Sequence, residues 1–256
     1  MVIVEENRNE SDVIGSRDAP YVNSLAQRYG QATMAFGQSH PSLPNYLELL
    51  SGSTQGVTDD GTGYAFAAPT LVGQLQSRGI GWRAYMEGMP SPCYSGAGSN
   101  GYAKKHDPFM YFTAIMQNAR ACSNVVPFSQ LRTDLDTNAA PPFLWVTPNL
   151  CNDGHDCSTA VADRWLSHVV PEIQATAAWK QDGILVITWD EGEDAANHIL
   201  TLVIRPGAPH ATSNRYYDHY SLLATIENRF GVARLGAAGQ AAPLTDLMIS
   251  GAVTQP

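Results

Sequence analysis

Six short apolar runs recur along the chain, and most of their residues are β-branched or aromatic. Their apolar character is continuous rather than alternating, which is typical of strands that are covered on both faces of a sheet. The runs are Met1–Val4, Ala32–Phe36, Trp82–Met86, Phe143–Val146, Ile184–Thr188 and Ile199–Ile204. The pattern therefore predicts a central sheet that is buried on both sides.

Amphipathic stretches with helical spacing lie between these runs. They are Ala19–Tyr29, Leu43–Leu50, Thr70–Ser77, Thr159–Ala177 and His219–Phe230. Ser158 is the expected N-cap of the longest stretch, and Gly231 is expected to end the last one. Strands that alternate with helices predict an α/β fold with a mostly parallel sheet and helices on both sides.

The stretch from Glu87 to Asn118 is rich in Gly, Pro, Ser and Tyr and is too long for an ordinary connection. Its aromatic residues favour an ordered cap over a disordered segment. No internal repeat, low-complexity tract or linker divides the rest of the chain. We therefore expect one domain over residues 1–256, with a loop-rich cap at about 87–118.

The composition excludes several classes of protein. Hydrophobic residues make up 44% of the 256 residues, which is too many for a disordered chain. Lys and Arg number 15 against 24 Asp and Glu, so the net charge of −9 argues against binding to nucleic acid. No apolar run is long enough for a transmembrane helix, and no feature indicates an obligate protein partner. A phosphorylated substrate stays open, because a bound cation can reverse the local potential.

The four cysteines are Cys93, Cys122, Cys151 and Cys157, and none of them forms a CxxC motif. Their even number favours two disulfides, with Cys151–Cys157 as one candidate pair, over four buried thiols. Disulfides favour an exported protein. Since the chain opens directly in a strand, we expect that its leader is absent from this sequence.

Polar residues follow three of the predicted strands. Glu6 and Asn7 follow the first strand, Asn149 closely follows the run that ends at Val146, and Asp190 and Glu191 follow another. The carboxyl ends of parallel strands meet at one edge of a sheet, where ligands bind. Each acid alone is more often a turn or cap residue. Together, Glu6, Asn7, Asp190 and Glu191 predict a site for Mg²⁺, Ca²⁺ or Mn²⁺, with Zn²⁺ as a further candidate.

The segment around Ser42 opens a predicted helix. Ser42 is expected as its N-cap, with Pro44 in the first turn. In the structural interpretation, Ser42 and Pro44 only start the helix. In the functional interpretation, the positive end of the helix and a metal activate the Ser42 hydroxyl as a nucleophile, and Asn45 donates its amide to a phosphoryl oxygen.

Three histidines flank predicted strand ends or helix starts. His155 lies in a loop with Asp153 between two cysteines, His219 opens a helix, and His40 precedes Ser42. A single histidine is more often structural. Three in such positions favour catalytic or phosphate-binding roles.

Six ordered motifs run over almost the whole chain. They are Glu6-Asn7, His40–Tyr46, Lys105–Phe109, Thr147–Asn149 with Asp153–Asp156, Thr188–Glu191 and His219–Leu223. With them the chain resembles the phosphoesterase family of bacterial acid phosphatases and phosphatidylcholine-type phospholipases C, within the alkaline-phosphatase-like superfamily. The resemblance implies a three-layer α/β/α sandwich. It also implies that Ser42 becomes phosphorylated.

The same resemblance implies that Glu6, Asn7, Asp190, Glu191 and the Ser42 hydroxyl hold one divalent metal. It places His40, His106, His155 and His219 around the phosphate, and Asn149 and Asp153 are expected to bind the substrate with them. Relatives with two metals carry further Asp and His ligands, whereas this chain has Cys151 four residues before His155. His155 and His219 are therefore expected to donate hydrogen bonds, and one of them to act as general acid.

These features predict an acid-phosphatase-like phosphomonoesterase acting on a small phosphoester. Two alternatives stay open. A phospholipase C would hold a choline headgroup against the aromatic residues of Trp82–Phe112 by cation–π contact. An exported phosphate- or sugar-binding protein would use the same metal pocket without turnover.

Overall fold

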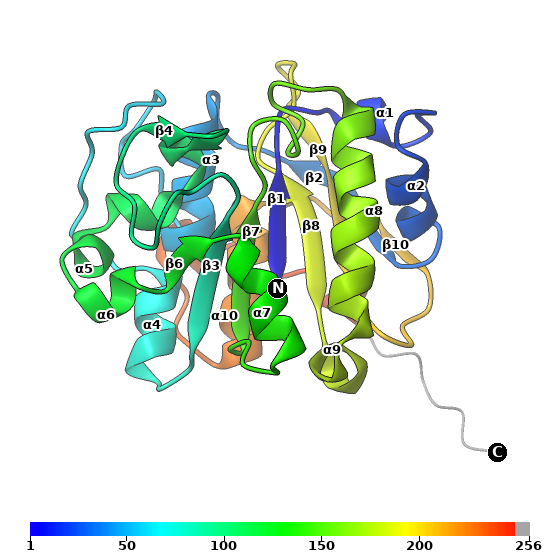
Figure 1. The fold of residues 1–256 in the computed structure, drawn as a ribbon. Coiled ribbons are helices and arrows are strands. Elements are labelled where there is room, and N and C mark those ends of the chain that lie inside the picture. The colour runs from blue at the N-terminus through cyan, green and yellow to red at the C-terminus, as the bar shows by residue number, and fades with distance from the viewer. Residues whose placement is uncertain (249–256) are drawn as a thin grey trace.

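The computed structural model describes residues 1–248, which form a nine-stranded mixed sheet between two layers of helices (Figure 1). The sheet has the order β10-β2-β9-β8-β1-β7-β3-β6, with β11 also paired to β2. Its strands are β1 (Val2–Glu5), β2 (Gly30–Phe36), β3 (Trp82–Met86), β6 (Val125–Pro127), β7 (Phe143–Thr147), β8 (Leu185–Trp189), β9 (His198–Ile204), β10 (Ala211–Ser213) and β11 (Tyr217–Asp218). The buried strand β1 lies at the centre.

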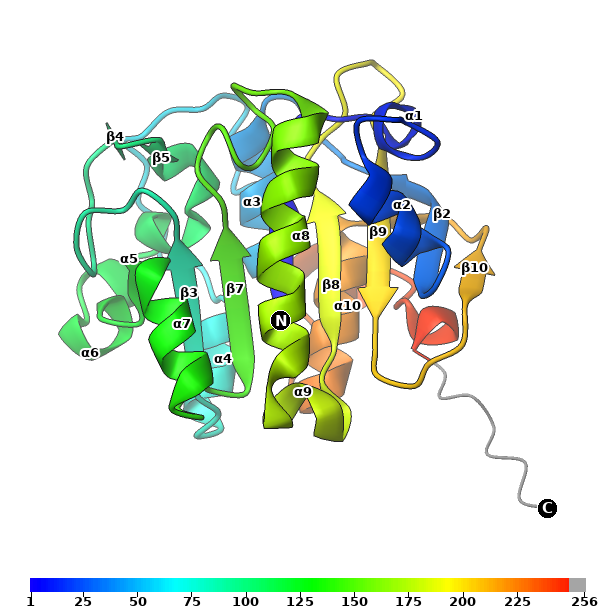
Figure 2. The same ribbon diagram turned by 45° about the vertical axis from the view of Figure 1, so that its right-hand side comes forward.

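The sheet is parallel except at β9, which pairs antiparallel with both β8 and β2. The connection between β8 and β9 spans only residues 190–197, which is too short for a crossover helix. The prediction of a mostly parallel α/β sheet is confirmed. The carboxyl ends of β1, β7 and β8 consequently meet at one edge (Figures 1 and 2).

Helices cover both faces of the sheet. In Figure 1, α7 (Ser129–Asp136), α8 (Thr159–Ala175) and α9 (Ala177–Asp182) lie in front of it. Behind it lie α3 (Ser42–Ser51), α4 (Leu71–Ser77) and α10 (His219–Phe230). The short helix α1 (Glu10–Val13) and α2 (Pro20–Ala26) follow the β1 loop, and α2 packs against α8. All ten residues of α3 are buried, so the segment that carries Ser42 is fixed within the core.

All six predicted strands are present; β3 has the predicted bounds, and no end of the other five shifts by more than two residues. Gly231 ends α10 in a left-handed conformation, as predicted. Ser158 is the N-cap of α8, although its side chain makes no capping hydrogen bond. The predicted N-cap of α3 was wrong: the helix begins at Ser42, and Pro41 is the N-cap. The Ser42 hydroxyl is therefore not used to cap its own helix.

The region around residues 87–118 contains short elements. They are β4 (Gly98–Ser99) and β5 (Tyr102–Ala103), which pair with each other, and then η1 (Lys104–His106), η2 (Pro108–Tyr111) and α5 (Thr113–Met116). Helix α6 (Ala119–Cys122) follows. Disulfides join Cys93 to Cys122 and Cys151 to Cys157, which confirms the predicted disulfides. The first bridge ties this region to α6, and the second closes the loop of His155.

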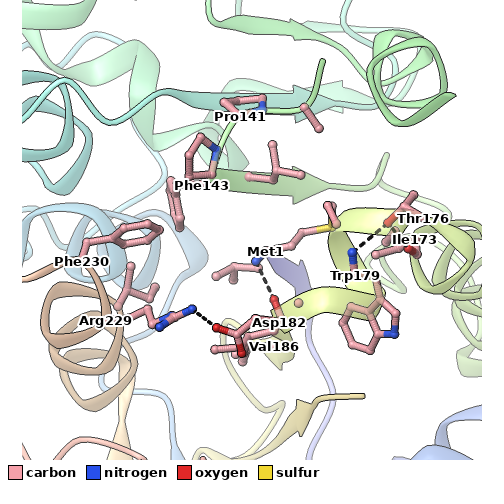
Figure 3. Close-up of a pocket in the computed structure, with 18 of the residues that line it drawn as sticks. Met1, Pro141, Phe143, Ile173, Thr176, Trp179, Asp182, Val186, Arg229 and Phe230 are labelled. Carbon is pink, nitrogen blue, oxygen red and sulfur yellow. Dashed lines mark hydrogen bonds and ion pairs between the residues drawn. The ribbon is translucent and has the colours of Figure 1, made fainter. Parts of the chain in front are cut away.

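An apolar cavity of about 610 Å³ lies at the other end of the sheet, by the amino ends of β1, β7 and β8 (Figure 3). Phe143, Ile173, Trp179 and Phe230 are among its lining residues. The Arg229–Asp182 ion pair lies at its border. None of the predicted site residues lines it.

The last short helices are η3 (Gly236–Gly239) and η4 (Thr245–Leu247). No helix within residues 1–248 is long and apolar enough to cross a membrane.

Candidate active site

Three loops bring acidic side chains together at the carboxyl edge of the sheet. Glu6 follows β1, Asp153 lies between β7 and α8, and Asp190 and Glu191 follow β8. Backbone hydrogen bonds hold these loops in register: the Glu6 amide donates to the Asp153 carbonyl at 2.9 Å, and the Asp190 amide to the Glu5 carbonyl at 3.0 Å. The convergence that the strand ends predicted is present in the structure.

Ser42 lies between two of these carboxylates. Its Oγ is 3.1 Å from Oε2 of Glu6 and 3.2 Å from Oε1 of Glu191, and the residue is only 1% exposed. It is the first residue of the ten-residue helix α3, whose positive end favours negative charge on the hydroxyl oxygen. A hydroxyl in this position can donate its proton to either carboxylate.

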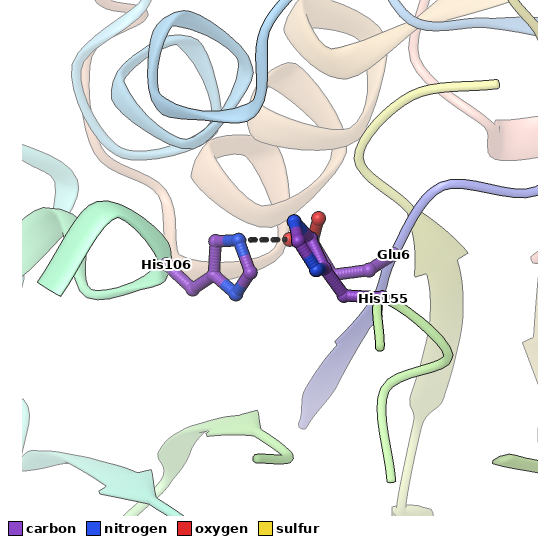
Figure 4. A group of neighbouring side chains, drawn as sticks. All are labelled: Glu6, His106 and His155. Atoms are coloured by element: carbon purple, nitrogen blue, oxygen red, sulfur yellow. Dashed lines mark ion pairs between the residues drawn. The ribbon is translucent and has the colours of Figure 1, made fainter. Parts of the chain in front are cut away.

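Glu6 is fully buried and has three polar neighbours. Its Oε1 accepts a hydrogen bond from the Tyr46 hydroxyl and lies 3.2 Å from Nε2 of His106. The Tyr46 ring stacks on the His106 ring with centroids 5.3 Å apart. Glu6, His106 and His155 each present a ligand atom within 4.8 Å of the others (Figure 4). Both histidines are thus candidate metal ligands, a role that the sequence interpretation did not give them.

His155 is held by two charged neighbours. Its Nδ1 is 2.7 Å from Oδ1 of Asp156, and its Nε2 is 3.0 Å from Nζ of Lys105. Lys105 also donates to Oδ2 of Asp60 at 2.9 Å, and Oδ1 of Asp60 accepts the amide of Leu43 at 3.0 Å. The Lys105 ammonium is therefore joined to the start of α3 through Asp60.

Ionisation of the buried acids is unfavourable in this environment. Burial, followed by repulsion from neighbouring acids, raises the pKa of Glu6 and of Asp190 well above the usual range. Burial likewise raises the pKa of Asp153 to about 8. Within residues 1–248, Oδ2 of Asp153 and Oδ2 of Asp190 are buried without a hydrogen-bond partner. Clustered carboxylate oxygens of this kind, with the Ser42 hydroxyl beside Glu6 and Glu191, fit a divalent cation.

Asn7 and the histidines His40 and His219 lie around this cluster. Asn7 adopts a left-handed backbone with φ of 49°, and its backbone N–H donates to Oδ1 of Asp190 at 3.3 Å. Nδ1 of His40 contacts Oε2 of Glu191. His219 is buried and donates from Nε2 to the carbonyl of Asp190, and burial lowers its pKa. His219 thus supports the Asp190 loop, and its part in proton transfer stays a prediction.

Two predicted phosphate ligands are engaged elsewhere in the structure. The Asn45 amide accepts from the backbone of Gln38 and Ser39 and donates to the Ser39 carbonyl at 2.8 Å. It therefore fixes the loop that carries His40. Oδ1 of Asn149 accepts from the next turn of backbone, the amides of Cys151 and Asn152, each at 3.0 Å. Contact of either residue with phosphate stays a prediction.

Arg8, which the sequence interpretation missed, ties the active-site loops together. Its guanidinium donates to the Cys157 carbonyl at 2.8 Å, to Oγ1 of Thr159 at 3.0 Å and to Oε1 of Glu193 at 3.0 Å. One side chain thus joins the β1 loop, the disulfide loop and the β8 loop.

Three further residues of the site were not identified from the sequence, namely Tyr46, Asp60 and Lys105. For Tyr46 a signal was present, because it lies one helical turn after Ser42 and shares its face.

The chain has the fold of the alkaline phosphatase superfamily. Solved structures share the fold at low sequence identity. A protein of the alkaline phosphatase superfamily from Vibrio parahaemolyticus superposes with a TM-score of 0.62 at 13% identity, covering 93% of this chain and 68% of that one. A lipoteichoic acid synthase from Listeria monocytogenes has a TM-score of 0.65 at 11% identity, covering 98% of this chain and 76% of that one.

The Phosphoesterase family model matches residues 6–233, and the chain belongs to this family. A phosphatidylinositol-3-phosphatase of Mycobacterium tuberculosis is 33% identical over 96% of this chain and 81% of that protein. A phosphate-repressible acid phosphatase of Penicillium chrysogenum is 28% identical over 84% of this chain and 55% of that protein. The chain spans about half the length of the fungal acid phosphatases that it matches. The protein is a hydrolase that acts on phosphoric ester bonds.

Proposed function

We propose that the protein is a divalent-metal-dependent phosphomonoesterase that works through a phosphoserine on Ser42. The observation that carries the proposal is the position of the Ser42 Oγ. It lies at the N-terminus of a buried helix and within 3.2 Å of both Glu6 and Glu191. This hydroxyl has a proton acceptor on either side and does not cap its own helix.

The chain's own residues supply a double displacement. The Ser42 proton passes to a neighbouring carboxylate, Oγ attacks phosphorus, and the bond from phosphorus to the leaving oxygen breaks. The leaving alcohol takes its proton from the Lys105–His155 pair, in which Nζ donates to Nε2 of His155 while Asp156 accepts from Nδ1. Water then cleaves the phosphoserine and releases inorganic phosphate. Glu6, Asn7, Asp190, Glu191 and Ser42 would hold the metal, which when bound supplies positive charge that lowers the pKa of the hydroxyl.

A monoester substrate is supported over a choline phosphodiester. The relatives are named acid phosphatases and a phosphatidylinositol-3-phosphatase, both of which are names of monoesterases. Six of the seven aromatic rings of Trp82–Phe112 are buried in the core, and only Tyr94 is half-buried, so this region offers little aromatic surface for a choline headgroup. We further propose export, which the two disulfides support.

The test is the variant Ser42→Ala with two chromogenic substrates, p-nitrophenyl phosphate and p-nitrophenyl phosphorylcholine. The variant should lose at least about 10⁴-fold in kcat on the monoester while its unfolding temperature is unchanged, because nucleophile removal acts on chemistry alone. Acid quench of the wild type during turnover, followed by mass spectrometry, should find phosphate on Ser42. Near-normal turnover by the variant, or a faster rate on the diester, would contradict the proposal.

A further inference from the structure

We propose that Lys105 binds the phosphoryl group and that Asp60 is the positioning residue that aims it, so that this pair sets the preference for phosphomonoesters over phosphodiesters. The inference rests on the proposed function, because it assigns specificity to the same site. Lys105 is one of only three lysines in the chain and lies in η1, within the cap region of residues 87–118.

Two chains of contact place the Lys105 ammonium beside the reacting group. On one side its Nζ is 3.0 Å from Nε2 of His155, a residue with a ring nitrogen within 4.8 Å of a Glu6 carboxylate oxygen. On the other side Asp60 links Nζ to the amide of Leu43, the residue next to Ser42. The Lys105 side chain is 20% exposed, so it is ordered and still open to a ligand.

The hydrogen-bonding groups leave one donor of Lys105 for a substrate. An ammonium has three hydrogens and no acceptor. One hydrogen is directed at Asp60 and one at His155, and no third partner is found within residues 1–248. The Leu43 amide already donates to Asp60, so it cannot also donate to a substrate while Asp60 stays in place. The remaining hydrogen of Lys105 is therefore the adjacent free donor.

The charge balance of the site explains the preference for monoesters. Within residues 1–248, Glu6, Asp153, Asp190 and Glu191 form no ion pair with a lysine or arginine. A monoester brings three non-bridging oxygens and close to two negative charges at neutral pH, whereas a diester brings two oxygens and one charge. One additional fixed cation therefore stabilises the monoester more than the diester.

Asp60 acts through Lys105 rather than on the substrate. Its two oxygens are used by Lys105 and by the Leu43 amide, which fixes the ammonium relative to α3. The neighbouring Lys104 provides a matched control. Its Nζ donates to the Thr62 carbonyl at 2.7 Å and lies over the Tyr111 ring, so it ties the same loop to η1 without facing the site.

The test compares Lys105→Gln, Lys105→Arg and Lys104→Gln. Lys105→Gln should lower kcat/KM on p-nitrophenyl phosphate by about 100-fold, the usual scale for loss of one donor to a transition-state oxygen, and on p-nitrophenyl phosphorylcholine by less than about tenfold. Lys105→Arg should recover part of the loss. Lys104→Gln should leave the ratio of the two rates unchanged. Equal losses on both substrates in Lys105→Gln, or an equal change of the ratio in Lys104→Gln, would overturn the inference.

Two further measurements separate this inference from the proposed function. Calorimetric binding of inorganic phosphate to the metal-loaded protein needs no turnover, and it should weaken at least about tenfold in Lys105→Gln. Unchanged phosphate binding would defeat the role of Lys105 even where Ser42 is the nucleophile. Asp60→Asn should reduce the monoester rate in the wild-type background and cost nothing more in Lys105→Gln. Additive losses would instead assign Asp60 a structural role.

Discussion

The two ends of the parallel strands have opposite chemistry. At the carboxyl edge lie four buried acids, two of which flank the Ser42 hydroxyl. Within residues 1–248, some of their oxygens have no hydrogen-bond partner. At the amino end, Phe143, Trp179 and Phe230 line an apolar cavity. The carboxyl edge concentrates charge that destabilises the metal-free fold, and the amino end contributes apolar burial that stabilises it. Substitutions at the two ends should therefore separate activity from stability.

The largest effect on activity in this comparison is expected for Asp190→Asn. Asparagine keeps the shape of the side chain but removes a charge that a cation needs, so kcat/KM should fall by about 10³-fold or more. The unfolding temperature of the wild type should rise on addition of Mn²⁺ or Mg²⁺, and that of the variant should not. Scanning calorimetry with and without metal, beside metal analysis, measures both. Metal content and activity equal to the wild type would remove Asp190 from the site.

The count of bound metal ions tests the site more finely. One equivalent per chain is expected when Glu6, Asn7, Asp190, Glu191 and Ser42 hold the ion. A second equivalent that is lost in His106→Ala would assign the group of Glu6, His106 and His155 to another ion.

At the amino end, Phe143→Ala should cost about 3–5 kcal/mol in the free energy of unfolding. The ring is buried, packs edge-on against Phe230 at 6.1 Å, and borders a cavity that its removal would enlarge. Chemical denaturation measures the loss. The kcat of the folded variant should stay within about twofold of the wild type, because Phe143 begins the strand whose far end leads to the site. A tenfold fall in kcat would show that the two ends are coupled.

The double variant Cys151→Ala and Cys157→Ala should have an intermediate effect, because it lowers both stability and activity. The bridge closes a loop of sequence separation 6 that carries Asp153 and His155. Its loss should cost about 2 kcal/mol in stability and, because those side chains lose their fixed positions, about tenfold in kcat. The pair Cys93 and Cys122, replaced in the same way, is the control that should leave kcat closer to the wild type.

The smallest effect concerns pH. Burial raises the pKa of Glu48 in α3 to about 7. Hydrogen bonds from Tyr220 and Ser39 act in the opposite direction, but their effect is smaller. The pKa of Glu48 in the folded protein lies above its unfolded value of 4.5. Its contribution to the free energy of unfolding is therefore complete below pH 4.5 and is lost as the pH rises through 7. Glu48→Gln should raise the unfolding temperature by a few degrees at pH 8 and leave it unchanged at pH 4.5. An equal shift at both pH values would exclude titration of Glu48 as the cause.

The sequence was informative where strands are long and apolar. The runs of β1, β7 and β8 predicted the sheet, and the polar residues after them predicted that Glu6, Asp190 and Glu191 converge. The strands β6, β10 and β11 have only two or three residues each and carry no pattern of their own. The position of Lys105 and Asp60 could not be predicted, because both lie on long connections whose path depends on tertiary contacts. Asn45 shows a further limit, since a buried amide first satisfies the backbone around it.

The contacts of Arg8 predict that three loops open as a single event. Its guanidinium bonds to Cys157, Thr159 and Glu193 while its own backbone continues the β1 loop. When one of these segments separates, the guanidinium loses partners on the other two. Backbone amides in the β1, disulfide and β8 loops should therefore exchange their hydrogens at one common rate, as a cooperative unit. In Arg8→Gln each loop should exchange at its own, faster rate.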